Sequence, residues 1–275
     1  MRYLEARAVG QDPARAVIQG APWDEATSYR RGAAAAPAAV REASDSIESY
    51  SPISGKDLQD LDIADAGDID LAGCDDVTAI DRIADATELL ARTGATVLTI
   101  GGDHSISIGT SRGLREVYPD LVHLVYDAHM DLRAEYDGTP LSHACGSRHM
   151  AAAGPTCVLG VRSGSREEYS DAPKLLTGFG PDLEIPLEFR QQMSGRPLFV
   201  SLDMDVLDPS ILPGTGTPEP GGPSYRELRA ALLALTGNNI VGFDIVEVAP
   251  PIDPSGLSPV VAAELIRDCL LAWFA

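Results

Sequence analysis

The sequence predicts an α/β fold, a single three-layer α/β/α domain with a mostly parallel central sheet. Apolar, β-rich runs alternate with helical patterns along the 275 residues, which is typical of a parallel sheet covered by helices on both faces. No internal repeat, low-complexity linker or long charge block divides the chain. Polar residues gather where strand patterns end, and open α/β sheets bind ligands there. We therefore expect one domain over residues 1–275.

Six apolar segments are the expected strands. They cover residues 16–20, 96–101, 122–129, 156–161, 198–204 and 240–248. Three segments repeat apolar side chains at helical spacing and are the clearest expected helices, at residues 77–93, 225–235 and 259–273. Gly94 follows the first of them, where a helix commonly stops. The Gly- and Pro-rich residues 213–223 follow a strand end that carries carboxylates, so we expect a site loop rather than a linker.

Composition limits the class of protein and the cell compartment that we expect. No apolar run approaches the roughly 20 residues of a membrane span. The first ten residues lack the pattern of a secretory signal, so a cytoplasmic protein is expected. The cysteines are scattered without a Cys-x-x-Cys pair, which favours reduced thiols over a zinc knuckle or a disulfide framework.

The charge is strongly negative, with 41 acidic residues against 21 basic ones and a formal net charge of −20. A polyanion would be repelled, so nucleic acid is not an expected partner, whereas a small cation would be attracted. Adaptation of the surface to a salty interior explains the same charge equally well.

The first polar segment, residues 101–105 (GGDHS), follows an expected strand. Its glycines let the backbone turn and present His104 to a cleft. On its own, a histidine in this place is more often a hydrogen-bonded loop residue than a ligand.

The next two polar segments alternate acidic residues at strand ends. In an extended backbone Asp127, His129 and Asp131 would share one face, and two carboxylates without a nearby Lys or Arg need a cation when buried. A solvated strand end is the alternative. Asp203 and Asp205 repeat the alternation. Each Asp-x-Asp alone is also typical of phosphatase or calcium sites, but two His and four Asp from three strand ends suit a pair of divalent ions with N and O ligands.

These segments together resemble the three signatures of the ureohydrolase (arginase and agmatinase) family, in order and in spacing. The signature segments are GGDHS, DAHMD and SLDMDVLDPSILPGTGTPEPGG, and residues 22–52, 160–169 and 242–250 also look like agmatinase segments. The resemblance covers nearly the whole chain. It implies an arginase-like fold and a homo-oligomer, a trimer or a hexamer. Residues 33–36 and Ala144-Cys145 depart from the family pattern near the expected entrance.

The resemblance also implies a ligand set for two Mn²⁺ ions per chain. One ion would take His104, Asp127, Asp131 and Asp203, and the other would take His129, Asp127, Asp203 and Asp205. It makes His143 the proton-transfer residue and Glu247 the carboxylate that faces the guanidinium, together with Asp205 and with Thr217 nearby. A hydroxide bridging the two ions would attack the guanidinium carbon.

The expected substrate is agmatine, cleaved to putrescine and urea. Residues 131–136 and 142–144 are closer to agmatinases than to arginases, and acidic surroundings favour a dication. Guanidinobutyrate, guanidinopropionate and arginine are alternatives, for which Arg133 could bind a carboxylate. Two further alternatives are a zinc-dependent deacetylase and a metal-binding scaffold without turnover.

Three other residues are considered for a role in the chemistry. His123 is expected to be structural and His149 to lie on the surface of a helix. Cys145 is close to His143 in sequence, but no base and orienting carboxylate are evident for a thiol nucleophile.

Overall fold

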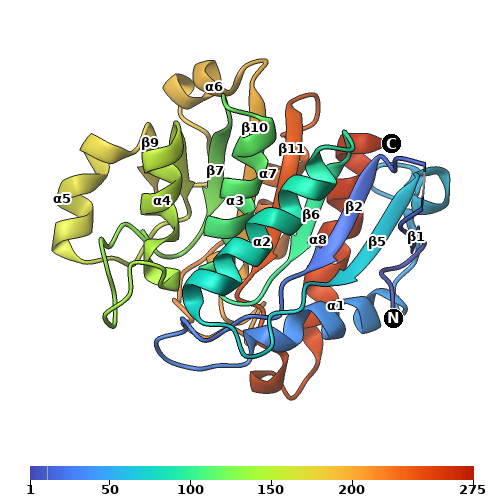
Figure 1. Ribbon diagram of the computed structural model, residues 1–275, viewed down its shortest axis with the longest axis horizontal. Helices are drawn as coiled ribbons and strands as arrows, with labels where there is room; N and C mark the ends of the chain where they lie inside the picture. Colours follow the sequence, from blue (N-terminus) through green and yellow to red (C-terminus); the bar gives the residue numbers. More distant parts are fainter. Residues whose placement is uncertain (11) are drawn as a thin grey trace.

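A nine-stranded sheet forms the centre of the computed structural model, which describes residues 1–10 and 12–275 (Figure 1). Every pairing between its strands is parallel. The strands are, in spatial order, β1 (Arg7–Ala8), β5 (Ile63–Asp68), β2 (Ala16–Gly20), β6 (Thr96–Ile100), β11 (Asn239–Val246), β10 (Pro197–Asp203), β7 (Val122–Tyr126), β8 (Thr156–Leu159) and β9 (Gly178–Gly180). The expected α/β fold with a mostly parallel sheet is confirmed.

Helices cover both faces of this sheet (Figure 1). One layer contains α2 (Asp76–Ala91), α3 (Ile106–Val117), α4 (Gly146–Ala153) and α5 (Arg166–Leu175). The other contains α1 (Ala36–Ser44), α6 (Leu187–Met193), α7 (Tyr225–Leu233) and α8 (Leu257–Phe274). A separate antiparallel pair, β3 (Tyr50–Ser51) and β4 (Lys56–Asp57), lies outside the sheet. Because the central strands are packed from both sides, they read as continuous apolar runs.

Local sequence explains where the predicted helices begin and end. Asp75 caps α2 by accepting a hydrogen bond from the Thr78 amide at 2.8 Å. Gly94 follows α2 at a φ of +85°, a conformation that glycine adopts without strain. α7 begins with a capping box between Ser224 and Glu227. All three predicted helices are present, with ends within a few residues of the expected ones. Among the described residues, no helix combines the length and apolar character needed to cross a membrane.

All six predicted strands are present, but β7 is shorter than expected and corrects one argument. It ends at Tyr126 rather than at residue 129. The Asp127 carboxylate accepts a hydrogen bond from the His129 amide at 2.5 Å, and Asp131 has a φ of +50°. The segment bends after Tyr126 and pairs only at His129, through an isolated bridge to Ser163, so the shared-face argument from a continuous extended strand is wrong for Asp127, His129 and Asp131. The bend nevertheless directs their side chains to one site.

Candidate metal centre

Four adjacent central strands, in the order β6, β11, β10, β7, position the site. His104 lies between β6 and α3, and Asp127 comes directly after β7. Asp203 is the last residue of β10, and Asp205 lies in the short 3-10 turn that follows. Parallel strands place their carboxyl ends at one edge of a sheet, so residues far apart in sequence meet there.

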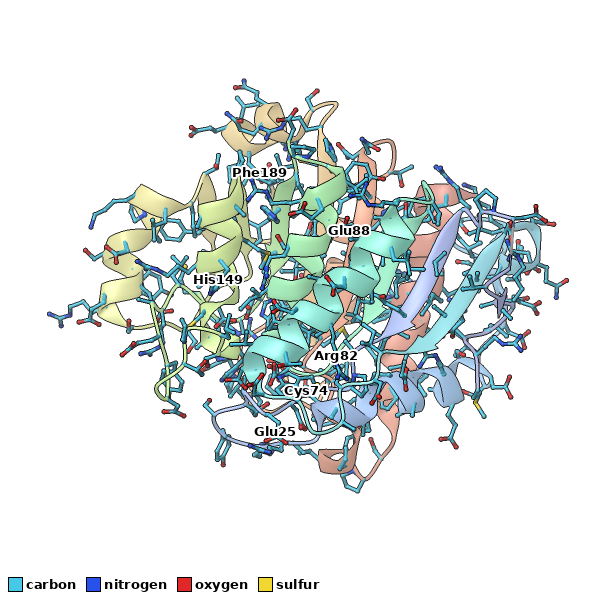
Figure 2. The ribbon with its side chains drawn as sticks, in the orientation of Figure 1. Glu25, Cys74, Arg82, Glu88, His149 and Phe189 are labelled. Carbon is cyan, nitrogen blue, oxygen red and sulfur yellow. The ribbon has the colours of Figure 1, made fainter. Side chains whose placement is uncertain are left out.

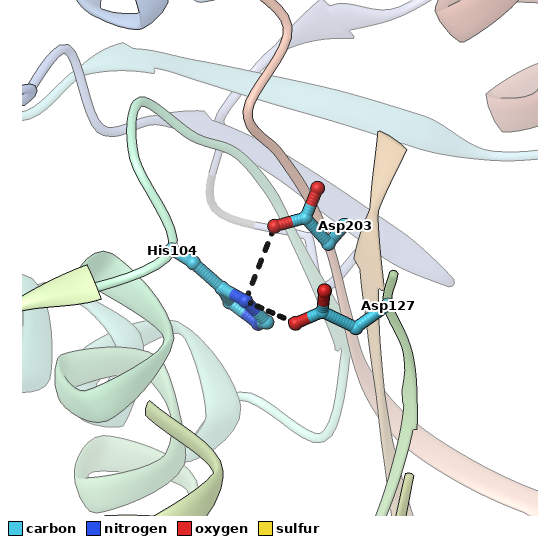
Figure 3. A group of neighbouring side chains, drawn as sticks. All are labelled: His104, Asp127 and Asp203. Carbon is cyan, nitrogen blue, oxygen red and sulfur yellow. Dashed lines mark ion pairs between the residues drawn. The ribbon is translucent and has the colours of Figure 1, made fainter. Parts of the chain in front are cut away.

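One group of side chains gathers around the imidazole of His104 (Figure 3). Its Nδ1 lies 3.0 Å from Asp127 Oδ2, 3.1 Å from Asp131 Oδ2 and 3.2 Å from Asp203 Oδ2. All four side chains are buried. Three carboxylate oxygens thus converge on one ring nitrogen, and one metal ion can be held by these donors.

A second group gathers around His129. Its Nδ1 lies 2.9 Å from Asp205 Oδ2 and 3.6 Å from Asp127 Oδ1. The two oxygens of Asp127 therefore face different groups, as a bridging ligand requires. The Asp203 carboxylate faces His104 through Oδ2, while its Oδ1 accepts a hydrogen bond from the Asp205 amide at 2.8 Å. The structure brings all six expected ligands together in two groups that share Asp127.

The pKa values of the ligand carboxylates are shifted because several negative charges are buried close together. Burial and the nearby carboxylates of Asp205 and Asp127 raise the pKa of Asp203 well above its usual value. Burial also raises the pKa of Asp127, but His104 and His129 outweigh it and hold that pKa below its usual value. Burial and Asp127 raise the pKa of Asp131 to about 6.

The donor set fits divalent metal ions. Among the residues that the structure describes, His104 Nδ1 and Asp127 Oδ2 are buried and have no hydrogen-bond partner in good geometry. Buried polar atoms are normally satisfied, so these two require another partner. Imidazole nitrogen with carboxylate oxygen suits borderline-hard divalent ions, and the site includes no thiolate of the kind that structural zinc prefers.

Two residues of the site have left-handed backbone conformations that non-glycine residues rarely adopt. They are Asp131 at a φ of +50° and Glu247 at +60°. Such strain costs on the order of 1–3 kcal/mol and is concentrated at functional sites. The Glu247 amide donates to Gly102 O at 2.8 Å, which ties the end of β11 to the loop that carries His104.

His143 and Glu247 lie beside the first group. Nδ1 of His143 is 3.5 Å from Glu247 Oε1, and the same carboxylate oxygen accepts a hydrogen bond from the His104 amide at 2.9 Å. Burial lowers the pKa of His143, but the Glu247 carboxylate outweighs burial and raises it to about 9. The Glu247 contact therefore favours the protonated form of the imidazole.

Ser28 is a contact of His143 that sequence reasoning missed. Its Oγ is 2.9 Å from His143 Nε2, across 115 positions of sequence. Residues 22–52 matched the family pattern, but nothing in that pattern assigned a role to this hydroxyl. The same loop is held against residues 213–223 by Arg30, which donates to Gly216 O at 3.1 Å and to Thr215 O at 2.6 Å.

A cavity of about 320 Å³ opens above these groups. Its lining residues include His129, Asp131, Arg133, His143, Glu168 and Thr217. Thr217 Oγ1 donates to Asp205 Oδ2 at 3.3 Å, as expected for a residue of the site loop. Arg133 Nε is 3.6 Å from Glu168 Oε2, and its guanidinium lies 4.8 Å from the centre of the Tyr136 ring.

The remaining candidates lie outside this arrangement. His123 is fully buried and its Nε2 is 2.9 Å from Ser111 Oγ; burial lowers its pKa to about 3, which agrees with the predicted structural role. His149 is half-buried on α4 (Figure 2). Burial raises the pKa of Cys145 to about 11, which disfavours a thiolate nucleophile.

Comparison with known proteins agrees with this geometry. Residues 14–272 match the arginase family, so the chain belongs to that family. The agmatinase of Bacillus anthracis is 40% identical over 264 residues, which is 94% of this chain and 91% of the relative. The mitochondrial guanidino acid hydrolase of Homo sapiens is 32% identical over 273 residues, 94% of this chain and 78% of the relative.

Solved structures give the same result. The agmatine ureohydrolase of Thermoplasma volcanium superposes with a TM-score of 0.87 at 31% identity, over 98% of this chain and 93% of that one. The ureohydrolase family and the arginase-like fold that the sequence motifs predicted are confirmed, and the chain is an enzyme of that family.

Proposed function

We propose that the chain is a binuclear manganese hydrolase that cleaves the guanidinium group of agmatine to give putrescine and urea. The observation that carries this proposal is the pair of His and Asp groups that share Asp127, next to a cavity that His129, Asp131 and His143 line. The agmatinase relatives support agmatine in particular.

The proposed ligands are the six residues expected from the sequence. His104, Asp127, Asp131 and Asp203 hold one Mn²⁺, and His129, Asp127, Asp203 and Asp205 hold the other. When bound, two such ions lower the pKa of a water shared between them, from 15.7 toward about 7, and so supply the nucleophile.

Glu247 is proposed to orient the guanidinium. Its carboxylate is 2% exposed, so an ion pair with the substrate forms with little screening by water. The His143 imidazole in contact with it keeps the pKa of Glu247 below its usual value, although burial raises it. Asp205 and Thr217 border the same space on the side of His129.

His143 is proposed to protonate the leaving amine. The bond that breaks joins the guanidinium carbon to the chain nitrogen of agmatine, and that nitrogen leaves poorly without a proton. The Glu247 contact, which raises the pKa of His143 to about 9, favours the protonated imidazole that this role requires. Such general acid catalysis typically contributes about 10²- to 10⁴-fold.

A guanidino acid is the second candidate substrate. The Arg133 guanidinium lies in the wall of the cavity and could bind a carboxylate at the tail of guanidinobutyrate. Glu168 favours agmatine instead, because its buried carboxylate, which accepts from the Leu132 and Ser165 amides, also lines the cavity and adds negative charge that attracts an ammonium tail. A relative named guanidino acid hydrolase keeps this alternative open.

Urea release from agmatine, guanidinobutyrate, guanidinopropionate and arginine, measured with added Mn²⁺, tests the proposal. We expect the highest kcat/KM for agmatine and about two manganese ions per chain. A clear preference for a guanidino acid would replace agmatine with that substrate. One bound zinc, or bound metal without urea from any of the four compounds, would reject the reaction itself.

Three further properties are proposed. We infer one domain over residues 1–275, since a single sheet takes strands from Arg7 to Val246. A homo-oligomer, trimeric or hexameric, and a cytoplasmic location follow from the family. Light scattering on the purified chain checks the oligomer, and a monomer would exclude it.

A further inference from the structure

Asp244 is a buried carboxylate to which the proposed reaction gives no role. It lies within β11, its exposed fraction is 0%, and burial raises its pKa to about 6. Among the described residues, neither of its oxygens has a hydrogen-bond partner in good geometry. An unpaired carboxylate in the core is costly, so its presence calls for a functional explanation.

Two hydroxyls connect Asp244 to the first ligand group. Ser201 is the cross-strand neighbour of Asp244 in the pairing of β10 with β11. Nε2 of His104 is 3.0 Å from Ser201 Oγ, and Ser201 Oγ donates to Ser107 Oγ at 3.2 Å. Ser107 and Ser201 both lie close enough to Asp244 to lower its pKa, although neither makes a hydrogen bond to it in good geometry. Hydrogen bonds therefore run from His104 through Ser201 to Ser107, and Asp244 lies beside the two hydroxyls.

We propose that Asp244 is a positioning residue for the metal centre, which acts through Ser107 and Ser201 to keep the His104 proton on Nε2. This inference rests on the proposed function. A histidine that binds a metal through Nδ1 must carry its proton on Nε2, and the partner of Nε2 fixes both the tautomer and the orientation of the ring. The negative charge of Asp244 favours hydroxyls that donate toward it, which leaves Ser201 Oγ free to accept from His104.

A matched pair of serine variants isolates this effect. Ser201→Ala and Ser111→Ala each remove a buried hydroxyl next to the Nε2 of a histidine, at 3.0 Å from His104 and 2.9 Å from His123. Of these two histidines, His104 belongs to a proposed ligand group and His123 does not. We expect Ser201→Ala and Asp244→Asn to weaken one of the two Mn²⁺ sites by about 10- to 100-fold, the usual effect of removing an outer partner of a ligand. Ser111→Ala should leave both sites unchanged.

Calorimetric titration of each folded, metal-stripped protein with Mn²⁺ measures the two affinities directly. The double variant Ser201→Ala/Asp244→Asn should lose no more affinity than the more affected single variant, because both changes interrupt one chain of groups. Additive losses would show that Asp244 acts by another route and would overturn the inference.

Thermal unfolding separates positioning from a structural role. For Asp244→Asn we expect a metal-free Tm at least equal to that of the wild type, since an unpaired buried charge is removed, and a smaller rise in Tm on adding Mn²⁺. A lower metal-free Tm with unchanged Mn²⁺ affinity would reject the positioning role. If the wild type itself binds no Mn²⁺, the proposed function fails, and this result differs from an unchanged affinity in the variant.

Discussion

Two groups of carboxylates that include buried members lie in this sheet, one on β5 and one at the candidate metal centre, and they are neutralised differently. Beside β5, Arg41 donates to both oxygens of Asp65, at 2.8 and 3.0 Å, and to Asp68 Oδ1 at 2.5 Å. At the candidate metal centre, the only ion-pair partners of the ligand carboxylates among the described residues are His104 and His129. The chain thus supplies a guanidinium beside Asp65 and no Lys or Arg ion pair, among the described residues, for the carboxylates of the proposed metal ligands.

The largest effect is expected from removing the carboxylate that the two ligand groups share. Asp127→Ala should lower kcat by more than about 1,000-fold, beyond the 10- to 100-fold typical of outer partners, and should reduce bound manganese. Urea release and metal analysis measure both. The protein should stay folded, because the removed side chain is one of several repelling carboxylates. If the variant keeps full activity and two bound ions, Asp127 is not the shared ligand and the contrast between the two clusters does not hold.

The next effect concerns the proton donor. His143→Asn should lower kcat by about 10²- to 10⁴-fold, while the two bound manganese ions are retained, since His143 is not a ligand. His149→Asn on α4 is the control and should leave kcat unchanged. If His143→Asn loses metal in proportion to activity, His143 belongs with the ligands and not with the proton transfer.

Breaking the structural cluster should affect stability instead of chemistry. Arg41 is 3% exposed, and Arg41→Met leaves the Asp65 carboxylate buried without its guanidinium. Removing one partner of a buried pair typically costs about 3–5 kcal/mol of the free energy of unfolding. Urea denaturation measures that loss, and the Mn²⁺ affinity of the folded fraction should be unchanged. A loss of metal affinity without loss of stability would mean that the two clusters are not independent.

A smaller effect is expected in the pH dependence of kcat. Because contact with Glu247 raises the pKa of His143 to about 9, the protonated imidazole persists below that pH, and kcat should fall as the pH rises through about 9. The raised pKa of His143 also contributes to the free energy of unfolding. That contribution is complete below about pH 6.5, the usual pKa of histidine, and is lost as the pH rises through about 9. In Glu247→Gln the pH at which kcat falls should move from about 9 toward neutral pH. If that pH does not change, the fall in kcat reflects the titration of another group.

The comparison also explains what the sequence could and could not predict. The central strands and the three signature segments could be predicted because apolar runs and closely spaced His and Asp residues are local features of the sequence. β5 was missed, since Ile63–Asp68 carries Asp65 and Asp68, and only the folded chain brings Arg41 to them. The contact between Ser28 and His143 spans 115 positions and leaves no local pattern. The bend after Tyr126 depends on a side chain accepting from its own backbone, which strand alternation does not reveal.

The placement of the ligands on separate strands has a consequence for the life of the newly made chain. The His104 amide meets Glu247 across 143 positions, and β11 stands between β6 and β10 in the sheet. Contacts of such long range form late, because closing the intervening chain costs entropy before the contact repays it. A polypeptide that lacks residues 226–275 contains every proposed metal ligand but not β11, so we expect it to bind the two ions only after that strand has been made and inserted between β6 and β10.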